Sequence, residues 1–429
     1  MTMSDGVVLG VDVGTSAVRC VALDADGRVV AMARRPLPPP DVDGRRITQD
    51  PRLWWAAADA AIAQTTAALD ARRIAAIAVD GTSGTLLLAD AAGEPLSDGW
   101  LYHEASCTDE AARIAEAAPD DCPARGVASP LARLLHLQPR VPQARHVLHQ
   151  ADWITGRLCG RFGVSDENNV LKLGYDIRAR RWAQWLDALG VRREWLPEVV
   201  APGTPVGALA PALARRWGLR HDVVVAAGTT DGVASFLATG ACEPGDAVTS
   251  LGSTLVVKLL SERPVFAPAH GVYSHRLGEH WLAGGASNSG GAVLLRFFDV
   301  AQIESLSRRL DPERDSGLDY YPLPGVGERF PAADPTLPPR LEPRPADDAL
   351  FLQGMLEGMA AIERLAYERI TGLGAGGPSR VFSVGGGARN PAWSRIRERR
   401  LGVPLAAPRH EEAACGAAML ARRAVQRPG

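Results

Sequence analysis

Two aspartates stand beside short turns of glycine, threonine and serine, and these residue types suit phosphate and proton chemistry. Asp12 precedes the turn 14–16, which reads Gly-Thr-Ser, and Asp231 lies in the run 228–232, which reads Gly-Thr-Thr-Asp-Gly. The backbone N–H groups of such a turn can contact phosphate oxygens, and glycine lets the backbone approach closely. A carboxylate beside the turn can hold magnesium, because Mg²⁺ keeps several waters and takes one or two carboxylates. A plain hairpin with a polar tip is the simpler interpretation of the first turn.

Asp231 follows an apolar run at 221–227, where we expect a strand to end and a helix to begin. A carboxylate at such a junction can act as a general base that accepts a proton from a hydroxyl group. Capping of the helix N-terminus is the competing interpretation.

Two further glycine-rich turns follow apolar strands in the second half of the chain. Residues 252–254 read Gly-Ser-Thr, and residues 385–387 are three glycines followed by Asn390. Together with the first turn, the turn at 252–254 could hold a triphosphate from two sides. The three glycines leave room for a flat ring or a phosphate against the backbone, and Asn390 could offer its amide to a purine or cap a helix. Neither the P-loop pattern nor the dinucleotide-binding fingerprint occurs in this chain.

A strand–turn–strand unit occurs at 10–23 and again at 248–260, which predicts two similar lobes, each with a glycine turn at the mouth of a sheet. The break between the lobes falls near residue 227. We expect the segment 105–220 to be mostly helical with loops and 311–347 to form a surface excursion. Periodicity and composition predict helices elsewhere, at 51–71, 347–371, 390–401 and 411–423.

Composition narrows the class of protein. A length of 429 residues suggests two or three domains. The net charge of −2 and the absence of a basic stripe argue against a nucleic-acid partner. No run approaches the ~18 apolar residues of a membrane span. The six cysteines show no C-x-x-C spacing, so a zinc or redox motif is unsupported and a reducing, cytoplasmic location is expected.

In combination these segments resemble the FGGY carbohydrate kinases of the actin-like ATPase superfamily, nearest to the short D-ribulose kinase and xylulose-kinase-like members of cyanobacteria and plants. The ordered runs 152–160, 165–169 and 174–177 look like the sugar-domain pattern of that family. The resemblance implies an α/β fold of two actin-like (ribonuclease H-like) lobes, each a mixed β-sheet flanked by helices, with an interlobe cleft. It implies an N-terminal sugar-binding lobe at 1–227 and a C-terminal lobe at 228–429 with most of the adenosine site.

The resemblance also implies roles for individual residues, with ATP and Mg²⁺ as cofactors. Asp12 would organise the metal, and Asp231 would take the proton from the attacking sugar hydroxyl. The residues expected to bind ATP are Gly14, Thr15, Ser16, Gly252, Ser253, Thr254, Gly385, Gly386 and Asn390.

The run 80–85, Asp-Gly-Thr-Ser-Gly-Thr, is similar to the Asp-x-Thr-Ser turn of ribulose kinases, whereas xylulokinases typically carry Gln-Met-His-Gly. It implies phosphorylation of D-ribulose to D-ribulose 5-phosphate, with Asp80 and Ser83 bonded to sugar hydroxyls. Both residues could instead only stabilise the turn. Where an arginine is usual in the family, the run 100–106 has none. His103 or Glu104 could replace it, or both could lie on the surface. Arg133 and His136 replace a usual lysine and tryptophan, which we interpret as drift.

Several alternatives stay open from the sequence. Within the same class the substrate could be xylulose, glycerol or another polyol. Outside it, the chain could be a non-kinase actin-like ATPase or a sugar-sensing pseudokinase. The expected partners are a small-molecule sugar and ATP, and the expected assembly is a monomer or a homodimer.

Overall fold

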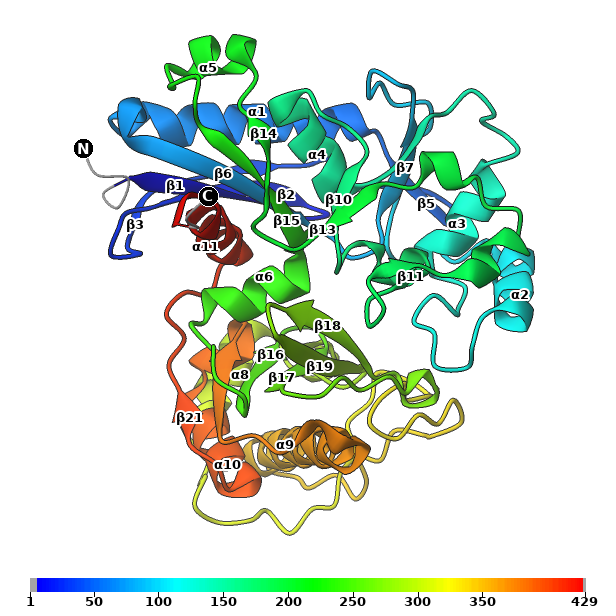
Figure 1. Cartoon of the computed structure of the whole chain (residues 1–429). Helices are drawn as coiled ribbons and strands as arrows, with labels where there is room; N and C mark the ends of the chain where they lie inside the picture. Colours follow the sequence, from blue (N-terminus) through cyan, green and yellow to red (C-terminus); the bar gives the residue numbers. More distant parts are fainter. Residues whose placement is uncertain (1–5, 427–429) are drawn as a thin grey trace. The chain divides into compact units, whose positions relative to one another are not determined.

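The computed structural model describes residues 6–426, which form two compact units (Figure 1). One unit comprises the chain up to Ala238 together with the segment from Glu412 onward, and the other spans Thr239–Glu411. The division expected from the sequence, at 227/228, differs from this one. It assigned residues 228–238 and the last helix to the second lobe, whereas both pack on the sheet of the first unit.

The first unit is built on a mixed six-stranded sheet. Its hairpins β1–β2 and β2–β3 are antiparallel, whereas β1 pairs in parallel with β6, and β6 with β15. The strand–turn–strand predicted near the N-terminus is therefore present. In spatial order the strands are β14 (Pro205–Ala208), β15 (Val224–Thr230), β6 (Ile74–Gly81), β1 (Val7–Val13), β2 (Ala17–Leu23) and β3 (Val29–Pro36).

Helices cover both faces of this sheet because successive side chains of a strand point to opposite sides. Leu9 and Val11 of β1 join the core that also contains side chains of α1 (Pro51–Ala67). Gly10, between them, faces α11 (Ala413–Gln426), and Figure 1 shows α1 and α11 on opposite sides of the sheet. The last helix of the chain thus completes the first unit.

The segment 105–220 was expected to be mostly helical, and that prediction is wrong. It contains three 3-10 turns and six short strands beside four helices; two of the strands pair with strands outside the segment, and the other four pair with one another. β9 completes a smaller sheet ordered β4 (Asp41–Asp43), β5 (Arg46–Gln49), β8 (Gly99–Trp100), β7 (Leu86–Ala89) and β9 (His146–His149). The other strands of the segment are β10 (Val164–Asp166), β11 (Tyr175–Asp176), β12 (Arg181–Trp182), β13 (Glu198–Val200) and β14. Its helices are α2 (Thr108–Ala117), α3 (Pro130–Leu137), α4 (Gln150–Cys159) and α5 (Pro211–Trp217), and α6 (Asp231–Ala238) follows β15.

The second unit repeats the succession of strands found in the first. Two antiparallel pairings, β19–β17 and β17–β16, are followed by two parallel ones, β16–β20 and β20–β21. The internal repeat predicted from the two strand–turn–strand segments is confirmed by this topology. In spatial order the strands are β18 (Tyr273–Leu277), β19 (His280–Ser287), β17 (Leu255–Ser261), β16 (Asp246–Leu251), β20 (Arg380–Val384) and β21 (Leu405–Ala406).

Two long helices of the second unit lie close to their predicted positions. α9 spans Asp348–Ile370, with the side chain of Asp347 accepting a hydrogen bond from the Ala349 N–H (3.1 Å), and α10 spans Pro391–Leu401. The shorter helices are α7 (Gly291–Leu294) and α8 (Val300–Ser307). Among residues 6–426, no helix combines the length and the apolar character that a membrane span requires.

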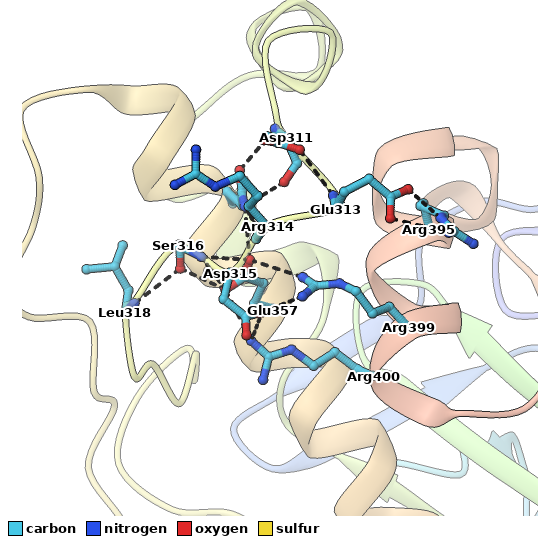
Figure 2. A network of polar contacts seen from close by, with 11 residues as sticks. Asp311, Glu313, Arg314, Asp315, Ser316, Leu318, Glu357, Arg395, Arg399 and Arg400 are labelled. Carbon is cyan, nitrogen blue, oxygen red and sulfur yellow. Dashed lines mark hydrogen bonds and ion pairs between the residues drawn. The ribbon is translucent and has the colours of Figure 1, made fainter.

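The segment 311–347 has little regular structure, as predicted, but ion pairs fasten its first part to α9 and α10. Figure 2 shows Asp315 and Glu357 facing Arg399 and Arg400. Asp315 lies 2.8 Å from Arg399 and 2.7 Å from Arg400, and the hydroxyl of Ser316 donates to Glu357 (2.7 Å). This excursion is therefore anchored to the body of its unit.

We predict that Gly10→Ala destabilises the first unit. A Cβ at position 10 would lie 1.8 Å from the backbone carbonyl oxygen of Ala414 in α11, so the helix must move away from β1. The expected cost is about 3 kcal/mol, the upper end for overpacking. Thermal melting, with hydrogen exchange of β1 amides, measures it.

Gly325→Ala is the matched control, because a Cβ there has no atom within 4 Å and the residue is exposed. It should change stability by no more than about 0.5 kcal/mol. A Gly10→Ala protein as stable as Gly325→Ala would contradict the proposed close contact between β1 and α11.

Candidate active site

Three predicted carboxylates lie at one edge of the first sheet. Asp12, near the end of β1, is aligned with Asp80, near the end of β6, in the parallel pair. Asp231 follows β15, the next parallel strand, as the first residue of α6. Because carboxyl ends of parallel strands meet at one edge, residues far apart in the chain converge there. The structure therefore brings together the predicted metal residue, one predicted sugar residue and the predicted base.

The burial of this edge changes the proton affinity of its acids. Burial raises the pKa of Asp12 to about 6; Arg19 opposes the shift and the charge of Asp231 adds to it. Burial also raises the pKa of Asp80 well above its usual range, and the charges of Asp12 and Asp231 raise it further. Both oxygens of Asp80 are buried, and among the described residues they face the acid Asp12 but receive no hydrogen bond from an N–H or hydroxyl donor. An unpartnered buried carboxylate is costly, so this edge is suited to receive a cation or a hydroxyl donor.

Arg19 is a charged residue of this edge that the sequence reasoning missed. It is the strand partner of Asp12 in the β1–β2 hairpin, and its Nη1 lies 3.1 Å from Oδ2 of Asp12. Its Nε lies 3.2 Å from Oε2 of Glu412, just before α11. A hairpin that turns near 14–16 brings residue 19 close to residue 12, and the observed register, with Val13 opposite Val18, places Arg19 directly opposite Asp12.

The donor set fits magnesium. Carboxylate oxygens are the ligands that Mg²⁺ takes in proteins, usually one or two together with waters. Asp12 and Asp80 supply such oxygens side by side, and no N–H or hydroxyl donor among the described residues satisfies those of Asp80.

The first predicted phosphate turn is closed by its own backbone. The Gly14 N–H donates to the Ala17 carbonyl (3.1 Å), and the Ser16 carbonyl accepts from the Leu37 N–H (2.9 Å). Thr15 is half-buried and Ser16 is exposed, so their hydroxyls lie at the accessible tip. The turn directly follows the strand that carries Asp12.

In the second unit, the turns at 252–254 and 385–387 follow neighbouring parallel strands. Ser250 of β16 is aligned with Val384 of β20, so both turns leave the sheet at the same edge. Gly385 has φ +90°, and a Cβ there would lie 2.9 Å from the Leu251 carbonyl oxygen, which requires glycine. A Cβ at Gly386 would meet no atom within 4 Å, so this position borders open space.

The residues of this unit that are predicted to bind the nucleotide differ in how many of their groups already form hydrogen bonds within the protein. The carbonyls of Gly252 and Ser253 accept hydrogen bonds from the N–H groups of residues 291 (2.8 Å) and 292 (3.1 Å), whereas the side chains of Ser253 and Thr254 are exposed and half-buried. Asn390 caps α10, since its Oδ1 accepts from the Trp393 N–H (3.1 Å) and its Nδ2 donates to Ser307 (2.8 Å). Capping, the competing interpretation, is present, and its nucleotide role stays a prediction.

A buried polar network beneath these turns was not predicted. Arg397 of α10 and Glu363 of α9 are fully buried and form two hydrogen bonds of 2.7 Å. Glu363 also accepts from Thr249 of β16 (2.5 Å), and Arg397 donates to Ser383 of β20 (2.8 Å). The network ties both turn-bearing strands to the helices below them.

The comparison with known proteins decides the family. Residues 7–238 match the N-terminal domain, and residues 247–425 the C-terminal domain, of the FGGY family of carbohydrate kinases. The chain belongs to the FGGY family of carbohydrate kinases. It is therefore an ATP-dependent sugar kinase, which disfavours the non-kinase ATPase and the sensor. The two matched domains meet between residues 238 and 247, in agreement with the structural division rather than the expected one.

Individual relatives of the kinase are similar over nearly the whole chain. It is 29% identical to the xylulose kinase of Streptomyces coelicolor over 97% of its own length and 88% of that protein. It is 26% identical to the xylulose kinase of Escherichia coli over 90% of this chain and 83% of that one. A crystal structure of a xyloylose kinase from Brucella ovis superposes with a TM-score of 0.89 at 27% identity, covering 98% and 90% of the two chains.

Glu104 of the kinase is not a surface residue, which corrects one of the alternatives drawn from the sequence. Its side chain is fully buried, pairs with Arg133 (3.2 Å) and accepts a hydrogen bond from the Ser106 N–H (2.6 Å). His103 is exposed and packs against the ring of Tyr102 at 4.6 Å between centroids. A buried, paired carboxylate is a poor candidate for direct sugar contact, so of the two only His103 keeps that prediction.

The raised pKa of Asp80 predicts that Asp80→Asn stabilises the kinase at neutral pH. An unfolded aspartate titrates near ~3.9, so the native state holds the proton more tightly and stability falls as pH rises above that value. Asparagine carries no charge and removes this loss. In magnesium-free buffer the variant should melt a few degrees above wild type at pH 7.5, and the difference should shrink towards pH 4.

Asp246→Asn is the control of opposite sign. Burial raises the pKa of Asp246, but the hydrogen bonds from Arg380 (2.6 and 3.0 Å), those from the N–H groups of Cys242 and Glu243, and the charge of Arg380 together outweigh burial, and the net shift is downward. This variant should melt lower than wild type at pH 7.5, with a smaller deficit as pH falls through the depressed pKa. An Asp80→Asn protein that melts below wild type at pH 7.5 would contradict the cost assigned to the buried carboxylate.

Proposed function

We propose that the kinase transfers the γ-phosphoryl group of Mg-ATP to a hydroxyl of a small ketose, with Asp231 as the general base. The observation that carries the proposal is the convergence of Asp12, Asp80 and Asp231 at the ends of three neighbouring parallel strands. In the reaction the sugar oxygen bonds to the γ-phosphorus, the bond to the bridging oxygen of ADP breaks, and Asp231 receives the hydroxyl proton.

The position of Asp231 supports its assignment as the base. It opens α6, where the helix N-terminus favours a negative charge, and its Oδ1 accepts a hydrogen bond from the Gly232 N–H (2.7 Å). Asp12 and Asp80 have raised pKa values, so each could compete with Asp231 for the proton of the sugar hydroxyl. A bound cation would hold both carboxylates ionised and so remove them from this competition.

Binding and positioning supply most of the catalysis in phosphoryl transfer, because the protein does little covalent chemistry. Mg²⁺, when bound, would neutralise phosphate charge, with Asp12 as its protein contact. The hydroxyls of the turns 14–16 and 252–254 would bind the phosphates. Gly385 and Gly386 would accept the adenosine part against bare backbone, since Gly386 borders open space.

The substrate class we propose is a 2-ketopentose, and two sugars compete for it. The Asp-x-Thr-Ser turn at 80–83 supports D-ribulose, with Asp80 and Ser83 as hydrogen-bonding residues and D-ribulose 5-phosphate as product. The names of the relatives support D-xylulose, which differs from D-ribulose only in its configuration at C3. The two proposals therefore differ in which configuration of the C3 hydroxyl the turn at 80–83 binds.

We predict that Asp231→Asn lowers kcat at least about a hundredfold, the usual scale for loss of a general base. Asparagine keeps the size and the helix-capping capacity, so ATP affinity should change little. Steady-state kinetics together with calorimetric ATP binding separate the two effects. Turnover within a few-fold of wild type would remove Asp231 from the role of base.

Turnover of a sugar panel tests the substrate. Coupled ADP release is measured with D-ribulose, D-xylulose and glycerol, with a reaction lacking sugar as the control. We expect kcat/KM for one ketopentose to exceed that for glycerol by at least about a hundredfold, because a site built to bond several hydroxyls rejects a shorter polyol. Equal or faster turnover of glycerol would overturn the ketopentose proposal.

A further inference from the structure

The turn that carries Ser83 is held almost rigidly, although its own tip is accessible. Thr82 and Thr85 are buried, Ser83 between them is half-buried, and the hydroxyls of Thr82 and Thr85 lie 2.6 Å apart. Oγ1 of Thr85 also accepts a hydrogen bond from the Tyr102 N–H (3.0 Å). Ser83 is thus the one side chain of residues 82–85 that a ligand can reach while its neighbours are fixed.

One anchor of this turn comes from α4. Oε1 of Gln150, the first residue of that helix, accepts hydrogen bonds from the N–H (3.1 Å) and the hydroxyl (2.9 Å) of Thr82. The Gln150 N–H donates to the Thr85 carbonyl (3.1 Å). These bonds fix Thr82, which precedes Ser83, and the carbonyl of Thr85, which follows it.

The other anchor is Arg133 of α3, which is fully buried. Its Nη1 donates to the Gly84 carbonyl (2.5 Å), which follows Ser83 directly. Its Nη2 contacts the carbonyls of Tyr102 (2.8 Å) and Ala128 (2.9 Å), and its Nε bonds to Glu104 (3.2 Å). One guanidinium therefore joins the turn at 80–85 to two other loops of the first unit.

These contacts need an arginine rather than a lysine. A guanidinium presents five N–H donors in a rigid plane, whereas an ammonium offers three donors from a single point. Arg133 meets carbonyls of three loops and, in addition, the carboxylate that balances its buried charge. A substitution that arose by drift would not be expected to satisfy so many groups at once. The contacts of Arg133 therefore correct the interpretation, drawn from the sequence, that arginine replaced the usual lysine at this position by drift.

We propose that Arg133 is a positioning residue that sets the affinity for the sugar. By fixing the carbonyl of Gly84, while Gln150 fixes Thr82, it holds the Ser83 hydroxyl in one orientation towards the substrate. The inference rests on the proposed function, because it assumes that the turn 80–85 contacts the sugar. Arg133 itself is fully buried, so it would act through the turn and not by direct contact with sugar or ATP.

Arg133→Lys in the full chain tests the proposal. Lysine keeps the charge opposite Glu104 but cannot serve all the carbonyls, so the turn loosens. We expect KM for D-ribulose or D-xylulose, whichever wild type phosphorylates, to rise at least about tenfold, with KM for ATP within about twofold. Loss of ground-state binding raises KM more than it lowers kcat, so the split between these constants is the readout.

Arg397→Lys is the matched control, because Arg397 is an equally buried arginine paired with a buried glutamate, in the other unit. It should lower the melting temperature at least as much as Arg133→Lys while leaving the sugar KM within about twofold. If Arg133→Lys leaves the sugar KM within twofold of wild type, or if Arg397→Lys raises it as much, Arg133 has only a structural role.

Two further measurements keep the outcome decisive. Gly84 has φ +99°, so Gly84→Ala strains the same turn without removing the ion pair; should Arg133→Lys fail to fold, this variant must raise the sugar KM instead, or the proposal fails.

Hydrogen exchange needs no sugar. If wild type phosphorylates none of the sugars, the proposed function fails, and Arg133 is then judged by exchange alone: acceleration confined to amides 82, 85 and 102 supports the positioning role, and unchanged exchange there excludes it.

Discussion

Backbone contact through glycine is the constraint on which the first unit depends. A Cβ at Gly10 of β1 would lie 1.8 Å from the Ala414 carbonyl oxygen, and one at Gly416 of α11 would lie 1.9 Å from that of Ala234 in α6. A Cβ at Gly228 of β15 would lie 1.6 Å from the Val79 carbonyl oxygen of β6. These three positions let three strands and two helices approach to backbone distance, directly behind the carboxylates at the strand ends. Without that approach the parallel strands would still form, but the acids would not be packed into one buried edge.

Buried acidic residues of this chain occur in two settings, with and without an arginine partner. Glu104 and Glu363 are fully buried, and each faces a fully buried arginine that satisfies it. Asp80 is as deeply buried, but among the described residues it faces another acid, Asp12, and receives no hydrogen bond from an N–H or hydroxyl donor. Removing one partner of a buried ion pair lowers the free energy of unfolding by several kcal/mol, roughly 3–5. A complete pair therefore holds its elements together, whereas an unpaired buried acid destabilises the fold. The paired charges lie under the turns, and the unpaired one lies where a ligand is proposed to bind, which is the expected distribution for a functional site.

How much of the fold and of the site could be predicted from the sequence depends on how far apart in the chain the interacting residues lie. The glycine turns after apolar runs, the acids beside them and the long helices α9 and α10 follow from local pattern, and the fold class with its internal repeat followed from their order. The supports of those turns did not, because they come from distant parts of the chain. Gln150 holds Thr82 across 68 residues, and Glu363 bonds to Thr249 across 114. Local composition says nothing of such pairs, and for the same reason short strands such as β9 and β14 were mistaken for helical sequence.

The repeated topology also explains why the two units differ chemically. β1 and β16 are equivalent strands, and both lead into a glycine followed by two hydroxyl residues, at 14–16 and 252–254. The residue two places before that glycine is Asp12 in the first unit but Ser250 in the second, and the aligned residue on the neighbouring parallel strand is Asp80 in one and Val384 in the other. The repeat has therefore kept the hydroxyl-bearing turn twice and the acids once. A turn of this kind suits phosphate in either unit, whereas proton and metal chemistry needs carboxylates, so the first unit alone has the groups for both.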